Sequence, residues 1–283
     1  MSADVLAEHF ESRRAHLRSV AYRVLGSTAD ADDAVQEAWL RAHAAGAGGV
    51  DNVGGWLTTI VARVSLNLLR SRTSRREVDW RTHVPDPLVE PIDDPEGRAV
   101  AHDEVGTALL VVLDRLAPAE RVAFVLHDQF AVPFDDVALV VDRSVAATRQ
   151  LASRARRKVR DEVPVQDDPP RRREVVAAYL AASQAGDFDR LLALLDPDVT
   201  ARLDAGAAGR SQLRRGAADV ASQAALYFGV AQFSRLVLVN GSPGLATVLA
   251  GGEVMSVLAF TVRHGRVVRI DILSDRERLR AVG

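Results

Sequence analysis

Apolar residues recur at helical spacing through residues 1–77. Over residues 10–25 they follow the i, i+3, i+4 pattern, which predicts a helix with one buried face. Gly26 is suited to end this helix, and one of the two hydroxyl residues after it is suited to cap the next. A glycine-rich break follows, and a further apolar stripe runs along residues 56–68. We therefore expect this segment to be helical throughout.

Residues 104–163 carry another helical pattern. Pro118 suits the first turn of a helix, where a missing backbone N–H costs nothing. A short helix opening at Pro133 is followed by a tight turn at Asp142, and Ser144 is a favoured residue to cap the helix after it. Two helices around so short a turn, the second of them basic, are typical of a helix-turn-helix.

The pattern changes again in the C-terminal part of the chain. Residues 171–194 read as two helices separated at Gly186, and short β-branched runs follow beyond residue 225. The turn pairs between these runs are Asn240-Gly241, Gly251-Gly252 and His264-Gly265. Such pairs are hairpin turns, so an antiparallel meander is expected, and helices followed by a meander make an α+β domain.

Two segments lack a periodic pattern. Residues 78–103 are rich in proline and acids, and we expect a semi-rigid spacer without helix or strand. Residues 164–170 read as a hinge. The expected domains are therefore 1–77 and 104–163, both helical, joined by this linker, and 171–283 after the hinge.

Charge is placed unevenly along a chain whose formal net charge is only −2. Residues 142–160 hold seven basic residues, whereas residues 78–104 hold eight acids and two arginines. The absence of Cys excludes disulfides and fits a reducing compartment. No signal sequence or membrane-length apolar run is present, so we expect a cytoplasmic protein with no membrane partner. No metal site and no cofactor site is predicted.

The charged helices allow more than one interpretation. A basic helix is often simply solvated, but one that follows a helix and a capped turn is placed to enter a DNA major groove. The acidic helix over residues 30–37 is either solvated, with its first-turn acids complementing the helix dipole, or a docking surface for a basic partner. The glycine-rich break and the arginine-bearing helix after it could engage single-stranded nucleic acid.

Three stretches together resemble a known family. They are "ADADDAVQEAWLRA", "GGWLTTIVARVSLNLLRSRTSRRE" and "LAPAERVAFVLHDQFAVPFDDVALVVDRSVAATRQLASRARRKV". In this order they resemble regions 2 and 4 of an extracytoplasmic-function (ECF) sigma factor. The linker motif "VPDPLVEP" and the segment "DFDRLLALLDPDVTARLD" resemble the subgroup that carries a SnoaL-like C-terminal extension. The implied fold is multidomain: two all-α sigma domains (a region 2 bundle and a region 4 helix-turn-helix) and a C-terminal α+β SnoaL-like cone-shaped barrel.

The resemblance implies roles for three groups of residues. Those implied to dock on core RNA polymerase are Asp30, Asp32, Asp33, Gln36 and Glu37. Those implied to bind the −10 element of promoter DNA are Asp51, Asn52, Asn67, Arg70, Arg75 and Arg76. Those implied to read the −35 duplex are Ser144, Arg149, Gln150, Ser153, Arg154 and Arg157. The expected function is therefore promoter-directed transcription initiation, modulated in cis by the C-terminal domain.

The chain departs from the family pattern at three places. Asp142 stands where the turn before the recognition helix commonly has Gly, although Asp tolerates the left-handed conformation. The glycine-rich motif of the extension appears only as "LDAGAAGR", Leu203 to Arg210, and its terminal Asn-Pro-Asp motif is replaced by "LSDRERL", Leu273 to Leu279. Both segments are implicated in regulation within the family.

A SnoaL-like domain also raises the question of catalysis, since some members of that fold are cyclases or isomerases. Asp204, Asp271 and His264 are the candidate acid–base residues, and we expect His264 to lie in an exposed turn. Fold analogy alone does not establish chemistry, so no catalytic residue and no enzyme activity is predicted. A small-molecule ligand is a further partner that such a pocket allows. The alternatives are a ligand-responsive helix-turn-helix regulator and a SnoaL-like cyclase or isomerase.

Overall fold

The computed structural model describes residues 3–75, 82–92, 106–207 and 209–280. These form two compact units. The described parts of 1–78 and 112–162 make the first, and those of 79–111 and 163–283 make the second. The linker residues therefore belong to the same unit as the C-terminal domain. Residues 76–81 and 93–105, which include Arg76 and parts of the linker, lie outside the described residues.

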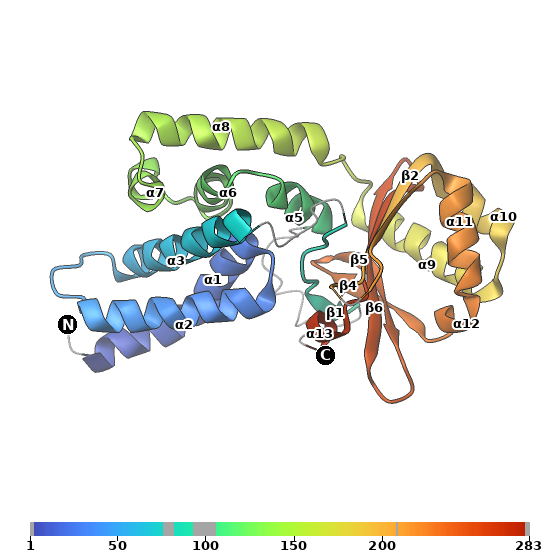
Figure 1. The fold of residues 1–283 in the computed structure, drawn as a ribbon, viewed down its shortest axis with the longest axis horizontal. Coiled ribbons are helices and arrows are strands. Elements are labelled where there is room, and N and C mark those ends of the chain that lie inside the picture. The colour runs from blue at the N-terminus through green and yellow to red at the C-terminus, as the bar shows by residue number, and fades with distance from the viewer. Residues whose placement is uncertain (1–2, 76–81, 93–105, 208, 281–283) are drawn as a thin grey trace. The chain divides into compact units, whose positions relative to one another are not determined.

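The first unit begins with three helices, labelled in Figure 1: α1 (Ala3–Leu25), α2 (Thr28–Ala45) and α3 (Val53–Arg75). The predicted boundary between the first two is confirmed. Gly26 adopts φ 70°, and the Ser27 side chain accepts a hydrogen bond from the Asp30 backbone N–H. The apolar stripe of α1 is buried as the periodicity requires.

The second set of helices in this unit is α5 (Thr107–Asp114), which straddles the boundary between the units, α6 (Pro118–Phe124), α7 (Phe134–Val141) and α8 (Val145–Glu162). Between α6 and α7 the helix continues as a π-helical turn, Val125–Gln129. Asp142 ends α7 in the left-handed conformation, with φ 56°, and the Ser144 hydroxyl accepts from the Ala147 N–H to cap α8. The predicted turn of the helix-turn-helix is therefore confirmed.

A buried arginine joins the two sets of helices. Arg121 on α6 is 2% exposed, pairs with the Asp114 carboxylate and donates to the backbone carbonyl of Arg23 on α1. Arg23 in turn lies over the Phe130 ring, 4.7 Å from its centroid. A buried guanidinium needs such partners, because an unpaired one would cost several kcal/mol, on the order of the penalty for any isolated buried ion.

The second unit is a mixed sheet of strands in the order β1-β4-β5-β6-β7-β2-β3. Its strands are β1 (Val89–Pro91), β2 (Leu195–Asp204), β3 (Gln212–Arg215), β4 (Ser234–Val239), β5 (Ser242–Val248), β6 (Val254–Arg263) and β7 (Arg266–Leu273). The predicted meander β4 to β7 is antiparallel, and its Asn240-Gly241 and His264-Gly265 turns have positive φ throughout. β2 pairs with β7 in parallel.

Helices cover the sheet unequally. α9 (Pro169–Ala185), α10 (Phe188–Leu194) and α11 (Ala217–Leu226) lie on one face, with α12 (Phe228–Ala231) at their edge (Figure 1). The opposite face packs against α13 (Arg276–Leu279) and the linker residue Val84. This arrangement is the α+β domain that the sequence predicts.

The linker corrects one expectation. Residues 89–91 form strand β1, which pairs antiparallel with β4, although no strand was expected between 78 and 103. Proline does not prevent this, since Pro91 lies at the end of an edge strand where no N–H is needed. The described linker is thus part of a folded domain and not the semi-rigid spacer without strands that the sequence predicts. Strands β2 and β3 were also not predicted.

Candidate nucleic-acid and polymerase interface

Helix α8 presents a continuous basic face to solvent. Gln150, Ser153 and Arg157 are exposed and are free of hydrogen bonds and ion pairs to the other described residues. The side chains that bury α8 are Thr148, Ala152 and Ala155. Val145, Leu151 and Val159 are only partly buried. The helix rests on small residues, and this brings its backbone close to α6.

Three other predicted −35 residues have partners within the unit. Arg154 donates to Glu120 at 2.7 Å, and Arg149 lies 5.5 Å from the centroid of the Phe134 ring. Burial opposes the charge of Glu120, but Arg154 and Lys158 hold the pKa of Glu120 below its usual value. Ser144 is the N-cap described above and remains exposed. These contacts with the rest of the unit therefore fix the position of α8 and balance part of its positive charge.

The acids of α2 divide into two groups. Asp30 pairs with Arg72, and Asp32 pairs with Arg18 at 2.6 Å, so these two stabilise the helical bundle. The second group, Asp33 and Glu37, lines a groove between α2 and α3. The residues that line this groove are Asp33, Gln36, Glu37, Leu40, Arg41, Val64, Asn67 and Leu68. Its volume is about 550 Å³. Predicted polymerase-binding residues and one predicted −10 residue thus meet in a single groove.

The groove also contains a residue that the sequence did not single out. Leu40 is 56% exposed, beside the acids and off the buried stripe of α2. Leu40 follows Ala38 and Trp39 and lies outside the apolar periodicity of this helix. An apolar residue off the buried stripe is the only signal in the sequence that could have indicated an exposed Leu40.

The predicted −10 residues lie along one helix and the loop before it. Asp51 and Asn52 are exposed, and the Asn52 side chain accepts from the Gly55 N–H at 2.9 Å, so it caps α3. Asn67 and Arg70 are exposed further along the helix. Arg75 ends α3, but its side chain is not described, and Arg76 lies outside the described residues.

A polar cluster fixes the linker to the C-terminal domain. We call it the linker cluster; its members are His83, Val84, Asp86, Asp204 and Arg278. The Asp204 carboxylate accepts from the Val84 N–H at 2.9 Å and from Arg278 at 2.8 Å, and Arg278 also donates to Asp86 at 2.6 Å. The His83 Nδ1 lies 3.3 Å from the same carboxylate. The two segments that depart from the family pattern therefore meet at the linker.

The electrostatics of this cluster favour a charged Asp204. Burial opposes ionisation, but the hydrogen bond from His83, the Val84 N–H and the charge of Arg278 hold the pKa of Asp204 well below its usual value. The Gly206 N–H also donates to this carboxylate at 3.1 Å. Gly206 has φ 67°, and a Cβ there would collide with the Asp275 carboxylate unless that side chain moved, so glycine is favoured at this position.

The candidate acid–base residues do not converge on a pocket. Leu203 and Ile272 face the cavity between the sheet and its helices, so Asp204 and Asp271 point to the opposite face. Asp271 is buried there beside Arg202, with 3.4 Å between the charged atoms. His264 is exposed in its hairpin turn, as predicted. None of the three lines the cavity.

Two absences hold for the part of the chain that the structure describes. None of the described helices combines the length and the apolar character that a bilayer span requires. Among the same residues, no group of three or more His, Asp or Glu side chains is placed to hold a metal ion.

The helical bundle, the helix-turn-helix and their exposed faces define a bipartite promoter-recognition protein. Family models agree: Sigma-70 region 2 matches residues 9–75, and Sigma-70, region 4 matches residues 107–159. The chain belongs to the ECF RNA polymerase sigma factors, and the relatives that show this also cover its C-terminal α+β domain. Its function is that of a sigma factor in transcription initiation.

Individual relatives cover nearly the whole chain. The ECF RNA polymerase sigma factor SigJ of Mycobacterium tuberculosis (strain ATCC 25618 / H37Rv) is 44% identical over 278 residues, 91% of this chain and 88% of its own length. A probable ECF RNA polymerase sigma factor, SigI, from the same strain is 34% identical, over 95% of this chain and 93% of its own. The crystal structure of M. tuberculosis SigJ matches with a TM-score of 0.77 at 39% identity, covering 97% of this chain and 98% of that one.

Proposed function

We propose that α8 reads the −35 duplex through Arg149, Gln150, Ser153, Arg154 and Arg157, with Ser144 at its N-terminus. The observation that supports this assignment is the exposed, unpaired state of Gln150, Ser153 and Arg157 on one face. Arg and Gln are the residues whose side chains make bidentate contacts with guanine and adenine edges. Arg154 would exchange its contact with Glu120 for one with DNA.

The proposed −10 surface comprises Asp51 and Asn52 in the loop before α3, Asn67 and Arg70 on the helix, and Arg75 and Arg76 at its end. Capping by Asn52 keeps the loop in one conformation, which favours capture of an unstacked base. The α2–α3 groove is the proposed docking site for core RNA polymerase, with Asp33, Gln36 and Glu37 supplying charge and hydrogen bonds. Asp30 and Asp32 would act through the bundle that they stabilise.

The C-terminal domain is proposed to modulate initiation in cis through the linker. The observation that carries this proposal is the combination of β1–β4 pairing with the linker cluster. A linker held in this way has a restricted reach, whereas a released linker would let the two DNA-binding regions vary their separation. Their separation must match the distance between the −10 and −35 elements, so holding or releasing the linker changes promoter use.

The test is run-off transcription with sigma-free core polymerase, comparing the full chain with a truncation ending near Pro164. The truncated chain keeps both sigma domains but loses β4 and Arg278. We expect both proteins to start transcripts at the same promoter position, with yields that differ several-fold. Equal yields across a range of salt and temperature would contradict modulation in cis.

The alternative of a ligand-responsive DNA-binding regulator is favoured by one observation, the cavity in the second unit. Gel filtration with core polymerase separates the two functions. A sigma factor elutes with the polymerase, whereas a classical repressor or activator elutes alone while still binding its operator.

A further inference from the structure

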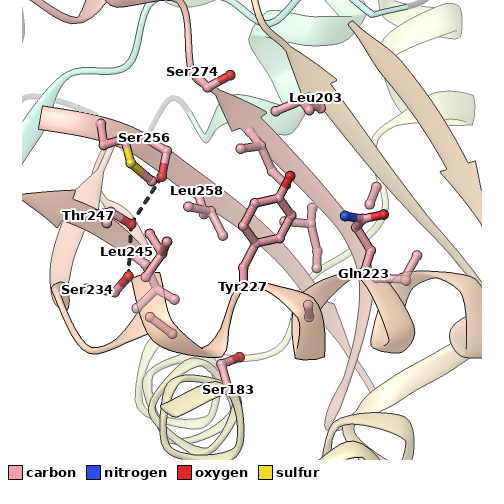
Figure 2. A pocket seen from close by; sticks show the side chains of 18 of the residues that line it. Ser183, Leu203, Gln223, Tyr227, Ser234, Leu245, Thr247, Ser256, Leu258 and Ser274 are labelled. Carbon is pink, nitrogen blue, oxygen red and sulfur yellow. Dashed lines mark hydrogen bonds between the residues drawn. The ribbon is translucent and has the colours of Figure 1, made fainter. Parts of the chain in front are cut away.

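The second unit encloses a cavity that the promoter-binding function does not use. Its volume is about 290 Å³, and it lies between the concave face of the sheet and helices α9, α11 and α12 (Figure 2). Strands β2, β5, β6 and β7 supply its floor. A cavity of this size is comparable to the lower end of small-molecule sites.

Most of the wall is apolar. Leu203, Leu245 and Leu258 project into the cavity from three different strands, and Leu180 and Ile270 close it from α9 and β7. Leu245 and Ile270 also belong to the hydrophobic core of the domain, so the wall is held rigidly. An apolar molecule that displaces water from such a preformed apolar wall binds favourably, because apolar surface of both the molecule and the wall is removed from water.

Three hydroxyl groups form a hydrogen-bonded chain in the wall, which also contains polar residues such as Ser183, Gln223 and Ser274. The hydroxyls of Ser234 and Thr247 are 2.8 Å apart, and Ser256 donates to Thr247 at 3.1 Å (Figure 2). Three hydroxyls carry three hydrogens, and two hydrogen bonds use only two of them. One O–H hydrogen at the Ser234–Thr247 end therefore stays available to an oxygen atom of a ligand.

The cavity contains little charge. Among the described residues that line it, none is Asp, Glu or His, and the charged ones are Arg214 and Arg276. Arg214 is neutralised by Asp219 at 2.8 Å and also donates to Gln212 at 2.9 Å. Arg276 is exposed to solvent at the rim, where water screens its charge. The interior therefore favours an uncharged occupant.

Access to the cavity lies beside Tyr227. This residue lines the cavity and is nevertheless 52% exposed, so solvent reaches the cavity at its ring, which projects from the helix among the other lining side chains (Figure 2). By contrast, Tyr179 on α9 also lines the cavity but is buried, and burial raises the pKa of its phenol to about 12, although the hydrogen bond with the Ser183 hydroxyl acts to lower it. The Tyr179 phenol is therefore neutral at physiological pH.

We propose that this cavity is a binding site for an uncharged, largely apolar small molecule that carries a carbonyl or ether oxygen. The apolar body of the molecule packs against the leucines, and its oxygen accepts the free O–H hydrogen of the Ser234–Thr247–Ser256 chain. The site is independent of promoter recognition, since it uses none of the residues assigned to DNA or polymerase.

The test uses the fluorescent naphthyl ketone 6-propionyl-2-(dimethylamino)naphthalene with the full-length protein. Its emission shifts to the blue in an apolar site, and we expect a saturable shift with 1:1 stoichiometry. The anionic probe 8-anilinonaphthalene-1-sulfonate should bind at least tenfold more weakly. Equal or tighter binding of the anionic probe would overturn the assignment of an uncharged ligand.

Two variants with matched controls locate the site. Ala224→Phe fills the cavity from α11 and should abolish the shift, whereas Ala218→Phe on the exposed side of the same helix should leave it unchanged. The double variant Ser234→Ala/Thr247→Val should lower the affinity for the naphthyl ketone about fivefold, which is the effect expected for the loss of one hydrogen bond. N-phenyl-1-naphthylamine, which has no carbonyl, should bind the double variant and the parent equally.

A measurement on the unaltered protein covers the case in which Ala224→Phe does not fold. Benzophenone, an uncharged aromatic ketone, cross-links to nearby C–H bonds on irradiation, and mass spectrometry identifies the labelled peptides. We expect labelling at Met255 and neighbouring cavity residues, with competition by the naphthyl ketone. Labelling confined to the exposed apolar residues Leu226, Phe228 and Phe233 would overturn the proposal.

Discussion

At the scale of single residues, Arg149 provides the sharpest test of promoter reading. Loss of one base contact costs about 1–3 kcal/mol, so Arg149→Ala should lower initiation at −35-dependent promoters roughly tenfold. Lys158→Ala removes the same charge from a residue that pairs with Glu120, and it should have a much smaller effect. Abortive and run-off transcription on promoters with intact and scrambled −35 elements would measure both. An Arg149→Ala protein that initiates normally would exclude this helix face from −35 reading.

Asp204 is the residue whose ionisation holds the linker cluster together. Because the folded state lowers the pKa of Asp204, its carboxylate contributes its full stabilisation at pH values above about 4, the ordinary value for Asp, and this stabilisation is lost progressively as the pH falls from there towards the lower pKa of the folded state. Asp204→Asn should therefore lower the free energy of unfolding by about 2 kcal/mol at pH 7. This is less than the cost of breaking a fully buried ion pair, because the Asp204–Arg278 pair is partly accessible to water.

The same variant predicts a pH profile. The difference in melting temperature between Asp204→Asn and the parent should shrink as the pH is lowered from 5 to 3. Asp198→Asn, an exposed position on the same strand, is the control and should show no such profile. A difference that stays constant with pH would mean that the charge of Asp204 is not what stabilises the cluster.

At the scale of elements, strand β1 depends on the Asn240 side chain. Its oxygen accepts from the Leu88 N–H at 2.9 Å, and its amide donates to Thr107 at 2.9 Å. Asn240→Gly keeps the left-handed backbone of the hairpin but removes both bonds. Amide hydrogens of residues 82–92 should then exchange about tenfold faster, as expected for the loss of one to two hydrogen bonds.

A matched control comes from the other hairpin of the same meander. His264 also has a left-handed backbone, with φ 54°, and the Asp167 carboxylate accepts from its backbone N–H. His264→Gly therefore retains that bond and should leave exchange in the linker unchanged. Equal acceleration in both variants would indicate a general loosening of the domain.

At the scale of the whole molecule, net charge limits independent DNA binding. With a formal net charge of −2, the chain lacks long-range attraction to DNA, and its basic faces are local. The free protein should therefore bind promoter duplex weakly, with affinity falling steeply between 50 and 200 mM salt, and core polymerase should increase that affinity by orders of magnitude. Fluorescence anisotropy with and without polymerase measures both, and tight, salt-insensitive binding by the free protein would contradict this picture.

The sequence by itself determined the elements that depend on neighbours along the chain. Helical periodicity located α1 and the turn of the helix-turn-helix, and dipeptides such as Asn240-Gly241 located the hairpins, because both are governed by local backbone preferences. The motif order was sufficient to assign the family.

Only the tertiary structure decided the features that join distant segments. The linker strand β1 and the parallel β2–β7 pair have hydrogen-bond partners more than sixty residues away, and no local pattern encodes such a partner. The division of the α2 acids between bundle pairs and the groove depends on where Arg18 and Arg72 lie. Likewise, the orientation of Asp204 and Asp271 away from the cavity depends on the register of two strands, since a one-residue shift would turn both carboxylates inward.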